Sequence, residues 1–282
     1  MGRIALIGIG TWGDIAPMIW LGLDYKKGHD VTVYANDVFK EAITESGLGF
    51  ASIGDSATQH AALNDTRFFD VSHSAAAVHE LMLNPHLSRL SKHDLSESYV
   101  VAQPYHRTPA NVRAYLQPCM ALAYPTVDRN SIALFPRWFA PKLQFGAHVG
   151  FPCYEPPFRS AFDATQVAGR VLVTFGTGGY AVDVDREAIR LGCEDAGFGV
   201  YWLPAEDVPH IPLSKLLPHC RAIIHHGGVG TIATAHACST RQVIIPLAYD
   251  QLGNGFCARL TMGAHMLDRA TFTRADVAAA LG

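Results

Sequence analysis

A chain of 282 residues is long enough for one large domain or two modest ones. Its hydrophobic content of 49% and charged content of 17% are typical of a soluble globular protein, and its net charge of −3 gives no basic field that would favour nucleic acid. No apolar run approaches the roughly 20 residues needed to span a bilayer, so no transmembrane segment is expected.

The spacing of cysteine and histidine argues against a disulfide framework and a metal site. The six cysteines show no CxxC spacing, which indicates reduced thiols in a cytoplasmic protein. The 14 histidines include no HExxH or similar motif, so no metal and no bound cofactor is expected. The histidines of the middle segment are expected on solvated helix faces. These are His60, His73, His79, His86 and His93.

The N-terminal stretch is predicted to be a buried strand over residues 3–9 that runs into a glycine loop. The loop has the pattern of the dinucleotide fingerprint, formed by Gly8, Gly10 and Gly13. With Asp37 as an acidic partner for the ribose, this pattern favours a nicotinamide-dependent oxidoreductase.

Asp14 lies at the mouth of the helix that follows this loop, where the fingerprint would place a pyrophosphate. Two anions there would repel each other, which weakens the dinucleotide interpretation. Asp14 also suits the N-cap of that helix, and Pro17 is tolerated in a first turn.

The middle of the chain has a weaker pattern, with helical character over 74–82 and 85–90. The segment 131–157 is rich in proline and aromatic residues, and Trp138 and Phe139 within it are expected to pack against a domain interface. We place the linker between two domains near residues 152–168.

The second half is predicted to open with a strand over 171–175. This strand ends in a glycine turn whose N–H groups could bind an anion, with Thr177 and Gly178 as candidates. A helix over about 185–196 and a strand over 199–203 follow.

The most informative stretch combines strands at 222–224 and 243–245 with a helix at about 232–238. The glycines of HHGGVGT precede that helix, whose first N–H groups and dipole favour a phosphate. Asp250 and Gln251 follow the second strand, at the edge where open α/β sheets bind ligands. A carboxylate beside an amide suits a polyhydroxylated group.

The strings HHGGVGT and PLAYDQLGN resemble the donor-binding signature of the GT-B glycosyltransferases. More narrowly, they resemble the group that includes bacterial rhamnosyltransferases, sterol glucosyltransferases and glycopeptide-antibiotic glycosyltransferases. In that family the histidine and glycine loop holds the diphosphate of a nucleotide sugar, and the Asp-Gln pair holds the sugar hydroxyls. The resemblance implies the following donor-binding residues: Thr177, Gly178, His226, Gly228, Gly230, Thr231, Asp250, Gln251 and Asn254.

The N-terminal loop, with its G-x-x-G-D-x-x-P pattern, resembles the same group and implies that Asp14 is the catalytic base. Family members are longer, and the missing length falls mainly between about residues 57 and 130, where the family builds much of its acceptor pocket. The chain is therefore either a naturally compact member or a longer chain with segments omitted.

The predicted fold class is α/β, with two Rossmann-like domains facing a cleft (GT-B). We expect an acceptor-side domain at 1–155 and a nucleotide-sugar-binding domain at 156–282. The resemblance implies an inverting, metal-independent transfer of a hexose from a UDP- or dTDP-sugar to a hydroxyl of a small lipophilic acceptor. Three alternatives stay open: the oxidoreductase above, a nucleotide-sugar epimerase and a non-catalytic nucleotide-sugar-binding protein.

Overall fold

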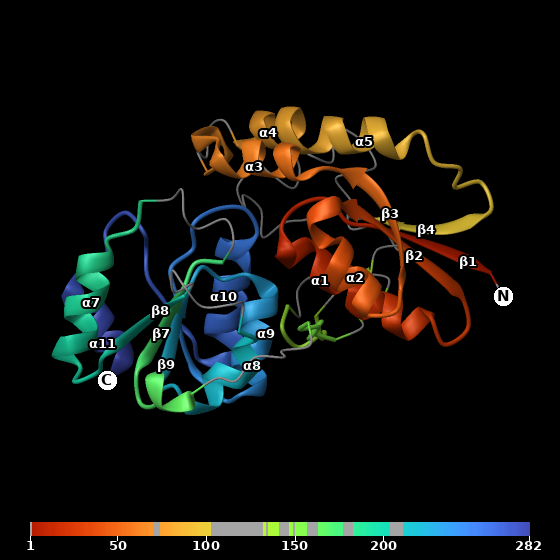
Figure 1. Ribbon diagram of the computed structural model, residues 1–282. Coiled ribbons are helices and arrows are strands. Elements are labelled where there is room, and N and C mark those ends of the chain that lie inside the picture. The colour runs from red at the N-terminus through yellow and green to blue at the C-terminus, as the bar shows by residue number, and fades with distance from the viewer. Residues whose placement is uncertain are drawn as a thin grey trace. The chain divides into compact units, whose positions relative to one another are not determined.

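The computed structural model describes most of the chain as two compact α/β units (Figure 1). The described residues are 2–69, 74–102, 132–133, 135–140, 147–148, 150–156, 163–176, 183–203 and 211–282. Those up to 102, together with 152–156, belong to the first unit, and the others belong to the second.

The first unit contains a four-stranded parallel sheet in the order β3-β2-β1-β4. Helices α1 and α2 lie on one side of this sheet, and α3, α4 and α5 lie on the other (Figure 1). The strands are β1 (Arg3–Ile7), β2 (Asp30–Asn36), β3 (Gly49–Gly54) and β4 (Ser98–Ala102). The helices are α1 (Trp12–Tyr25), α2 (Lys40–Glu45), α3 (Ser56–Asn64), α4 (Ser74–Ala77) and α5 (Asn84–Leu90), with short helical turns η1 (Asp37–Phe39), η2 (Thr66–Phe69) and η3 (Val78–Leu83).

The second unit contains a five-stranded parallel sheet in the order β11-β10-β9-β7-β8. Its strands are β7 (Val171–Thr174), β8 (Val200–Leu203), β9 (Ala222–His225), β10 (Arg241–Ile244) and β11 (His265–Met266), and β5 (Ile132–Ala133) pairs separately with β6 (Ala147–His148). Its helices are α7 (Arg186–Asp195), α8 (Leu213–Leu216), α9 (Val229–Ala237), α10 (Gln251–Met262) and α11 (Arg274–Leu281), with turns η5 (Ala164–Gln166) and η7 (Leu217–His219). The predicted α/β class with two parallel-sheet domains is confirmed.

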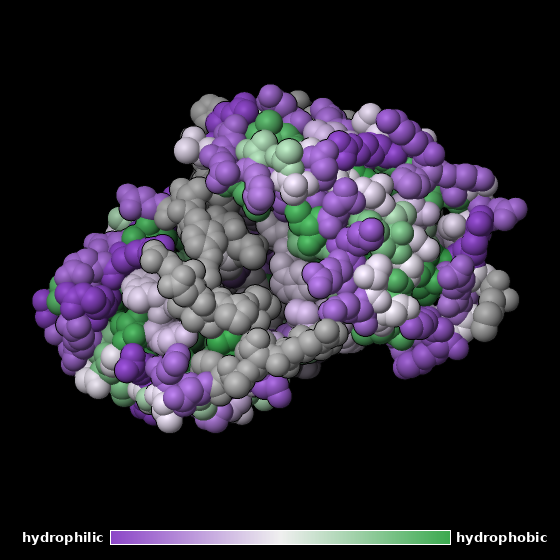
Figure 2. Space-filling view, in the orientation of Figure 1, coloured by the Kyte–Doolittle hydropathy of each residue, from purple (hydrophilic) through white to green (hydrophobic). Residues whose placement is uncertain are grey.

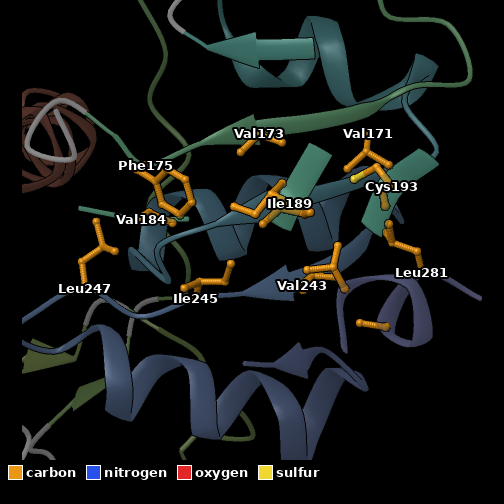
Figure 3. Close-up of a cluster of buried hydrophobic side chains, with 14 residues drawn as sticks. Val171, Val173, Phe175, Val184, Ile189, Cys193, Val243, Ile245, Leu247 and Leu281 are labelled. Atoms are coloured by element: carbon orange, nitrogen blue, oxygen red, sulfur yellow. The ribbon is translucent and has the colours of Figure 1, made fainter. Parts of the chain in front are cut away.

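The second sheet is buried on both faces, as is usual for parallel strands with near-continuous apolar runs. Val171 and Val173 of β7 pack with Ile189 of α7 and with α11 on one face (Figure 3). Leu172, between them, packs with Leu216 and Ile223 on the other. Figure 2 shows that the outer surface of α7 is hydrophilic, and there Arg190 bonds both Glu187 and Glu194.

The aromatic segment that precedes residue 155 packs into the core of the second unit. Phe139 is 1% exposed and packs with Ile232, Ile244 and Ala258, whereas the neighbouring Trp138 is 46% exposed. The segment 152–156 then packs in the first unit, where the ring of Tyr154 lies 6.1 Å from that of Trp12. The chain thus contributes to each unit more than once, and the single domain boundary near residue 155 stays a prediction.

Three helices begin earlier than the sequence predicted. The N-cap of α1 is Thr11, not Asp14, so Pro17 lies beyond the first turn. Helix α9 begins at Val229 rather than at about residue 232, and α10 begins at Gln251, whereas the sequence predicts a helix over Phe256–Met262. Each of these three helices has a glycine in its first turn. Glycine is about 1 kcal/mol less favourable than alanine in a helix, and tertiary packing overrides this cost here.

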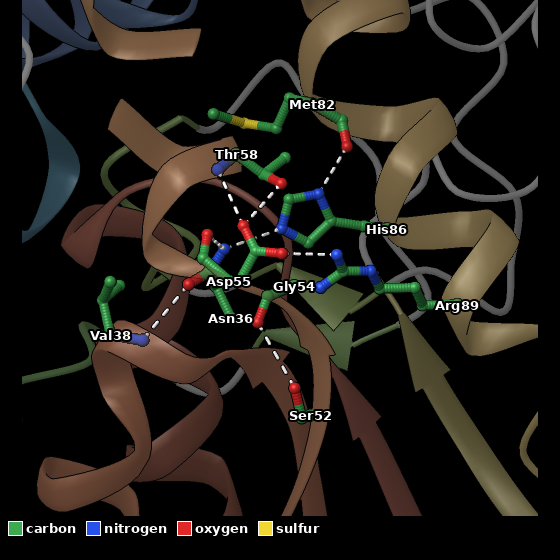
Figure 4. A network of polar contacts seen from close by, with 9 residues as sticks. All are labelled: Asn36, Val38, Ser52, Gly54, Asp55, Thr58, Met82, His86 and Arg89. Carbon is green, nitrogen blue, oxygen red and sulfur yellow. Dashed lines mark hydrogen bonds and ion pairs between the residues drawn. The ribbon is translucent and has the colours of Figure 1, made fainter. Parts of the chain in front are cut away.

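The prediction of a solvated position is wrong for His86, which is 1% exposed. Its Nδ1 donates to the Met82 carbonyl at 2.5 Å, and its Nε2 accepts from Asn36 Nδ2 at 3.2 Å (Figure 4). Asp55 beside it caps α3 through the Thr58 N–H at 2.8 Å and pairs with Arg89. These polar side chains join β2, β3, α3 and α5, so they form a structural cluster inside the first unit.

Within the described part of the chain, every helix is too short or too polar to cross a membrane.

Candidate functional site

The glycine loop between β9 and α9 lies at the carboxyl edge of the second sheet. Gly228 is the N-cap residue of α9, and among the described residues no side chain caps this helix. The N–H groups of the first turn, from Val229 to Thr231, are therefore directed out of the helix end. These donors and the positive end of the helix dipole form a favourable place for an anion.

His226 lies with its imidazole ring between two glycines of neighbouring turns. A Cβ atom at Gly176 would lie 2.9 Å from its Cε1, and a Cβ atom at Gly228 would lie 2.6 Å from its Nε2. Both separations are too short for a real Cβ atom. The His226 ring can therefore occupy this position only because residues 176 and 228 are glycine. Burial lowers the pKa of His226 to about 4, against a smaller opposing effect of the Thr174 backbone, and the ring is neutral at pH 7.

His225, to which the sequence assigned no role, is fully buried beneath the loop. Its Nδ1 accepts from the Gly227 N–H at 3.1 Å, so the ring proton is on Nε2, which donates to Gln242 Oε1 at 3.1 Å. Burial lowers the pKa of His225 to about 3. The sequence signal that could have indicated its burial was the position of His225 at the carboxyl end of an apolar strand.

Asn254 connects the glycine loop to the segment after β10. Its Nδ2 donates to Asp250 Oδ2 at 2.8 Å and to the Gly227 carbonyl at 3.2 Å. Asp250 is the N-cap residue of α10 and keeps access to solvent. Its carboxylate is therefore held beside the loop and still able to meet a ligand.

Gln251 stabilises the turn that leads into α10. Its Oε1 accepts from the N–H groups of Leu247, at 2.8 Å, and Ala248, at 3.0 Å. Tyr249 within this turn has a φ of 57°, a left-handed conformation that is uncommon for a tyrosine. The turn thus uses the amide oxygen of Gln251, and no described residue accepts from its Nε2.

Seven of the nine predicted donor residues lie at this carboxyl edge of the second sheet. They are His226, Gly228, Gly230, Thr231, Asp250, Gln251 and Asn254. The other two, Thr177 and Gly178, lie outside the described residues. The structure also adds His225 and Gln242 beneath the loop.

Asp14, the predicted base, belongs to the first unit, at the carboxyl edge of its sheet. Its Oδ2 accepts from the Thr11 N–H at 2.7 Å, so the carboxylate covers the start of α1. A Cβ atom at Gly10 would lie 2.1 Å from that oxygen, which explains this glycine without a ligand. Gln59 Nε2 donates to the Gly10 carbonyl at 2.7 Å and fixes the same turn.

Comparison with known families covers the C-terminal part of the chain. Residues 178–281 match the family model described as the C-terminal domain of erythromycin biosynthesis protein CIII-like proteins. The chain is similar to an aclacinomycin-T 2-deoxy-L-fucose transferase of Streptomyces galilaeus, at 38% identity over 72 residues, which is 25% of this chain and 16% of that protein. It is also similar to a 10-deoxymethynolide desosaminyltransferase of Streptomyces venezuelae, at 50% identity over 40 residues, which is 14% of this chain and 9% of that protein. The matches thus span at most about a sixth of these curated relatives.

Solved structures resemble the chain over nearly its whole length. The spinosyn rhamnosyltransferase SpnG has a TM-score of 0.65 at 17% identity, covering 100% of this chain and 90% of that one. The Streptomyces sp. SF2575 glycosyltransferase SsfS6, complexed with thymidine diphosphate, has a TM-score of 0.61 at 18% identity, covering 94% and 88%. Residues 178–281 are therefore similar to the EryCIII-like C-terminal domain family, and the chain has the GT-B fold seen in these glycosyltransferase structures.

Proposed function

We propose that the protein transfers a hexose from a UDP- or dTDP-sugar to a hydroxyl of a small lipophilic acceptor. The observation that carries this proposal is the uncapped start of α9, with neutral His226 and the Asp250 carboxylate beside it. One side of this site suits a diphosphate, and the other suits sugar hydroxyls. The relatives named as sugar transferases support the same chemistry.

The two glycine loops of the chain differ in a way that favours sugar transfer over nicotinamide chemistry. At α1 the Thr11 N–H is already bonded to Asp14, so a pyrophosphate there would displace a carboxylate and meet its charge. At α9 the cap is a glycine without a side chain. The second loop is therefore the better anion site, although only the first has the dinucleotide pattern.

In the proposed reaction the acceptor oxygen attacks the anomeric carbon while the bond from that carbon to the diphosphate oxygen breaks. The acceptor proton passes to the Asp14 carboxylate. The first N–H groups of α9 and His226 receive the negative charge of the leaving diphosphate, as aimed donors do in other transfer enzymes. Asp250 and Gln251 Nε2 orient the sugar. Attack opposite the leaving group inverts the anomeric carbon, and none of these steps uses a metal.

Asp14→Asn tests the role of the base. Asparagine keeps an oxygen that can accept from the Thr11 N–H, so the fold and donor affinity should be unchanged. Release of nucleoside diphosphate from UDP- and dTDP-glucose, with a panel of hydroxylated aglycones, should fall by about 10²–10⁴-fold. Asp24→Asn, the same charge change on the exposed surface of α1, is the control. Equal turnover in both variants would remove Asp14 from the mechanism.

The same assay separates the two remaining alternatives. A nucleotide-sugar epimerase would convert the donor to its epimer with no acceptor present. A non-catalytic binding protein would bind the donor and release no diphosphate with any acceptor. Transfer with inverted configuration at the anomeric carbon, observed by NMR of the product, is the outcome that our proposal predicts.

A further inference from the structure

A continuous series of hydrogen bonds runs beneath the glycine loop from one strand to the start of α10. Gln242 of β10 accepts from His225, and His225 accepts from the Gly227 N–H. The Gly227 carbonyl accepts from Asn254, which also bonds Asp250. The series therefore connects the sheet to both halves of the proposed donor site.

Gly227 is the central link, and its backbone is held from both sides. Its φ is 94°, a backbone conformation that residues other than glycine rarely adopt. A Cβ atom there would lie 2.9 Å from the Gln251 carbonyl and 3.0 Å from Ile244 Cγ2. The N–H of Gly227 is bonded to His225 and its carbonyl to Asn254. These two bonds restrict the backbone of Gly228 and of the first turn of α9.

His225 can form its two bonds only as the Nε2–H tautomer. Its Nδ1 must be unprotonated to accept from Gly227, and its Nε2 must carry the proton to donate to Gln242. A second proton on the ring would turn Nδ1 into a donor that faces the Gly227 N–H. Because the ring is fully buried, water cannot stabilise a second proton on it.

We propose that His225 is a positioning residue for the donor diphosphate, acting through the Gly227 N–H rather than by touching the ligand. This inference rests on the proposed function above. The bond to His225 turns the Gly227 N–H inward, so that the N–H groups that follow it, from Val229 to Thr231, are the ones directed at the phosphate oxygens. Gln242 fixes the tautomer that makes this possible.

Two substitutions of similar size distinguish the roles of the two ring nitrogens of His225. His225→Asn places an amide oxygen near the position of Nδ1 and can still accept from Gly227, but it does not reach Gln242. His225→Gln reaches Gln242 but loses the acceptor for Gly227. Both variants remove the ring from the core, so a role limited to core filling would affect them similarly.

The experiment measures the binding of UDP and dTDP by calorimetry to the wild-type chain and both variants, with the free energy of unfolding measured alongside. His225→Gln should weaken binding by about tenfold or more, the effect of one lost hydrogen bond, while His225→Asn keeps most of the affinity. Equal losses in the two variants, or losses that follow their stability, would overturn the proposal.

Two ligand-free measurements keep this test separate from the proposed function. Nitrogen NMR of the wild-type chain should show His225 as the Nε2–H tautomer, and the Gly227 amide should exchange slowly in the wild type and in His225→Asn but rapidly in His225→Gln. An Nδ1–H tautomer, or equal exchange in both variants, contradicts the positioning role even if nucleotides bind. Failure of the wild-type chain to bind UDP or dTDP contradicts the proposed function and, with it, the assignment of His225 to a donor site.

Discussion

Gly228 is the N-cap residue of α9 and Gly230 lies in its first turn, and the two glycines have different surroundings. A Cβ atom at Gly228 would collide with His226, whereas one at Gly230 would have no atom of the described residues within 4 Å. The contact with His226 therefore explains why residue 228 is glycine, whereas the described residues leave space beside Gly230. A ligand that approaches the start of α9 closely would use that space.

Gly230→Ala tests this interpretation, because the chain itself has room for the methyl group. Alanine should raise the free energy of unfolding by up to about 1 kcal/mol through its higher helix propensity. Binding of UDP or dTDP should nevertheless weaken, since the methyl group would lie where the diphosphate is expected. Calorimetric binding and denaturant unfolding check the two effects, and unchanged affinity would place the ligand elsewhere.

The two histidines of the glycine loop also predict how stability depends on pH. The pKa of His225 is lowered to about 3 and that of His226 to about 4, both by burial, while the unfolded chain has ordinary histidine pKa values near 6.5. Between these limits the unfolded chain binds more protons, so stability is fully present above about pH 6.5 and is lost as the pH falls toward 3. His225→Asn should show a shallower decline than the wild type in urea unfolding measured from pH 7 to pH 4. Parallel curves would mean that His225 titrates normally in the fold.

Helices α7 and α11 approach each other closely at Gly192. A Cβ atom there would lie 2.6 Å from the Arg274 carbonyl and 2.6 Å from Val277 Cβ, both of which belong to α11. The ion pair of Arg274 with Asp195 lies beside this contact. The glycine therefore sets the distance between the two helices.

Gly192→Ala should destabilise the protein by about 1–3 kcal/mol, because overpacking would force the helices apart. Gly230→Ala is the matched comparison, since both substitutions gain helix propensity and only one meets a neighbour. The measurement is the midpoint of denaturant unfolding. A stability gain in Gly192→Ala would show that α11 can move aside without loss.

The sequence predicted the type of each of these elements better than their ends. Short apolar runs that lead into glycine loops indicated β1, β7 and β9, because parallel strands are buried on both faces. The starts of α9 and α10 were placed too late, since glycine in a first turn lowers the local propensity and only tertiary contacts restore it. The burial of His86 was also missed, because its partner Asn36 lies 50 residues away.

The chain as a whole is two parallel-sheet units, and the sequence predicted this class from its β-α-β patterning and its two glycine loops. It could not predict that Phe139 packs with α9 and α10, because that contact joins residues about a hundred positions apart without a local signal. The donor site itself stays a prediction. Within it, the motif gave no internal roles: in the structure His225 and Asn254 bond the glycine loop, and Gln251 Oε1 bonds the turn before α10.

The central claim is that the start of α9 binds the diphosphate of a nucleotide sugar. The most direct test is a thermal unfolding panel of the wild-type chain and His226→Ala with UDP, dTDP, GDP and NAD⁺. A ligand at about 100 times its Kd stabilises the fold by roughly 2.7 kcal/mol, which is a clear shift of the midpoint. We expect a shift with UDP or dTDP that is lost in His226→Ala. A shift with NAD⁺ alone, equal in both proteins, would rule out this donor site and return the function to the first glycine loop.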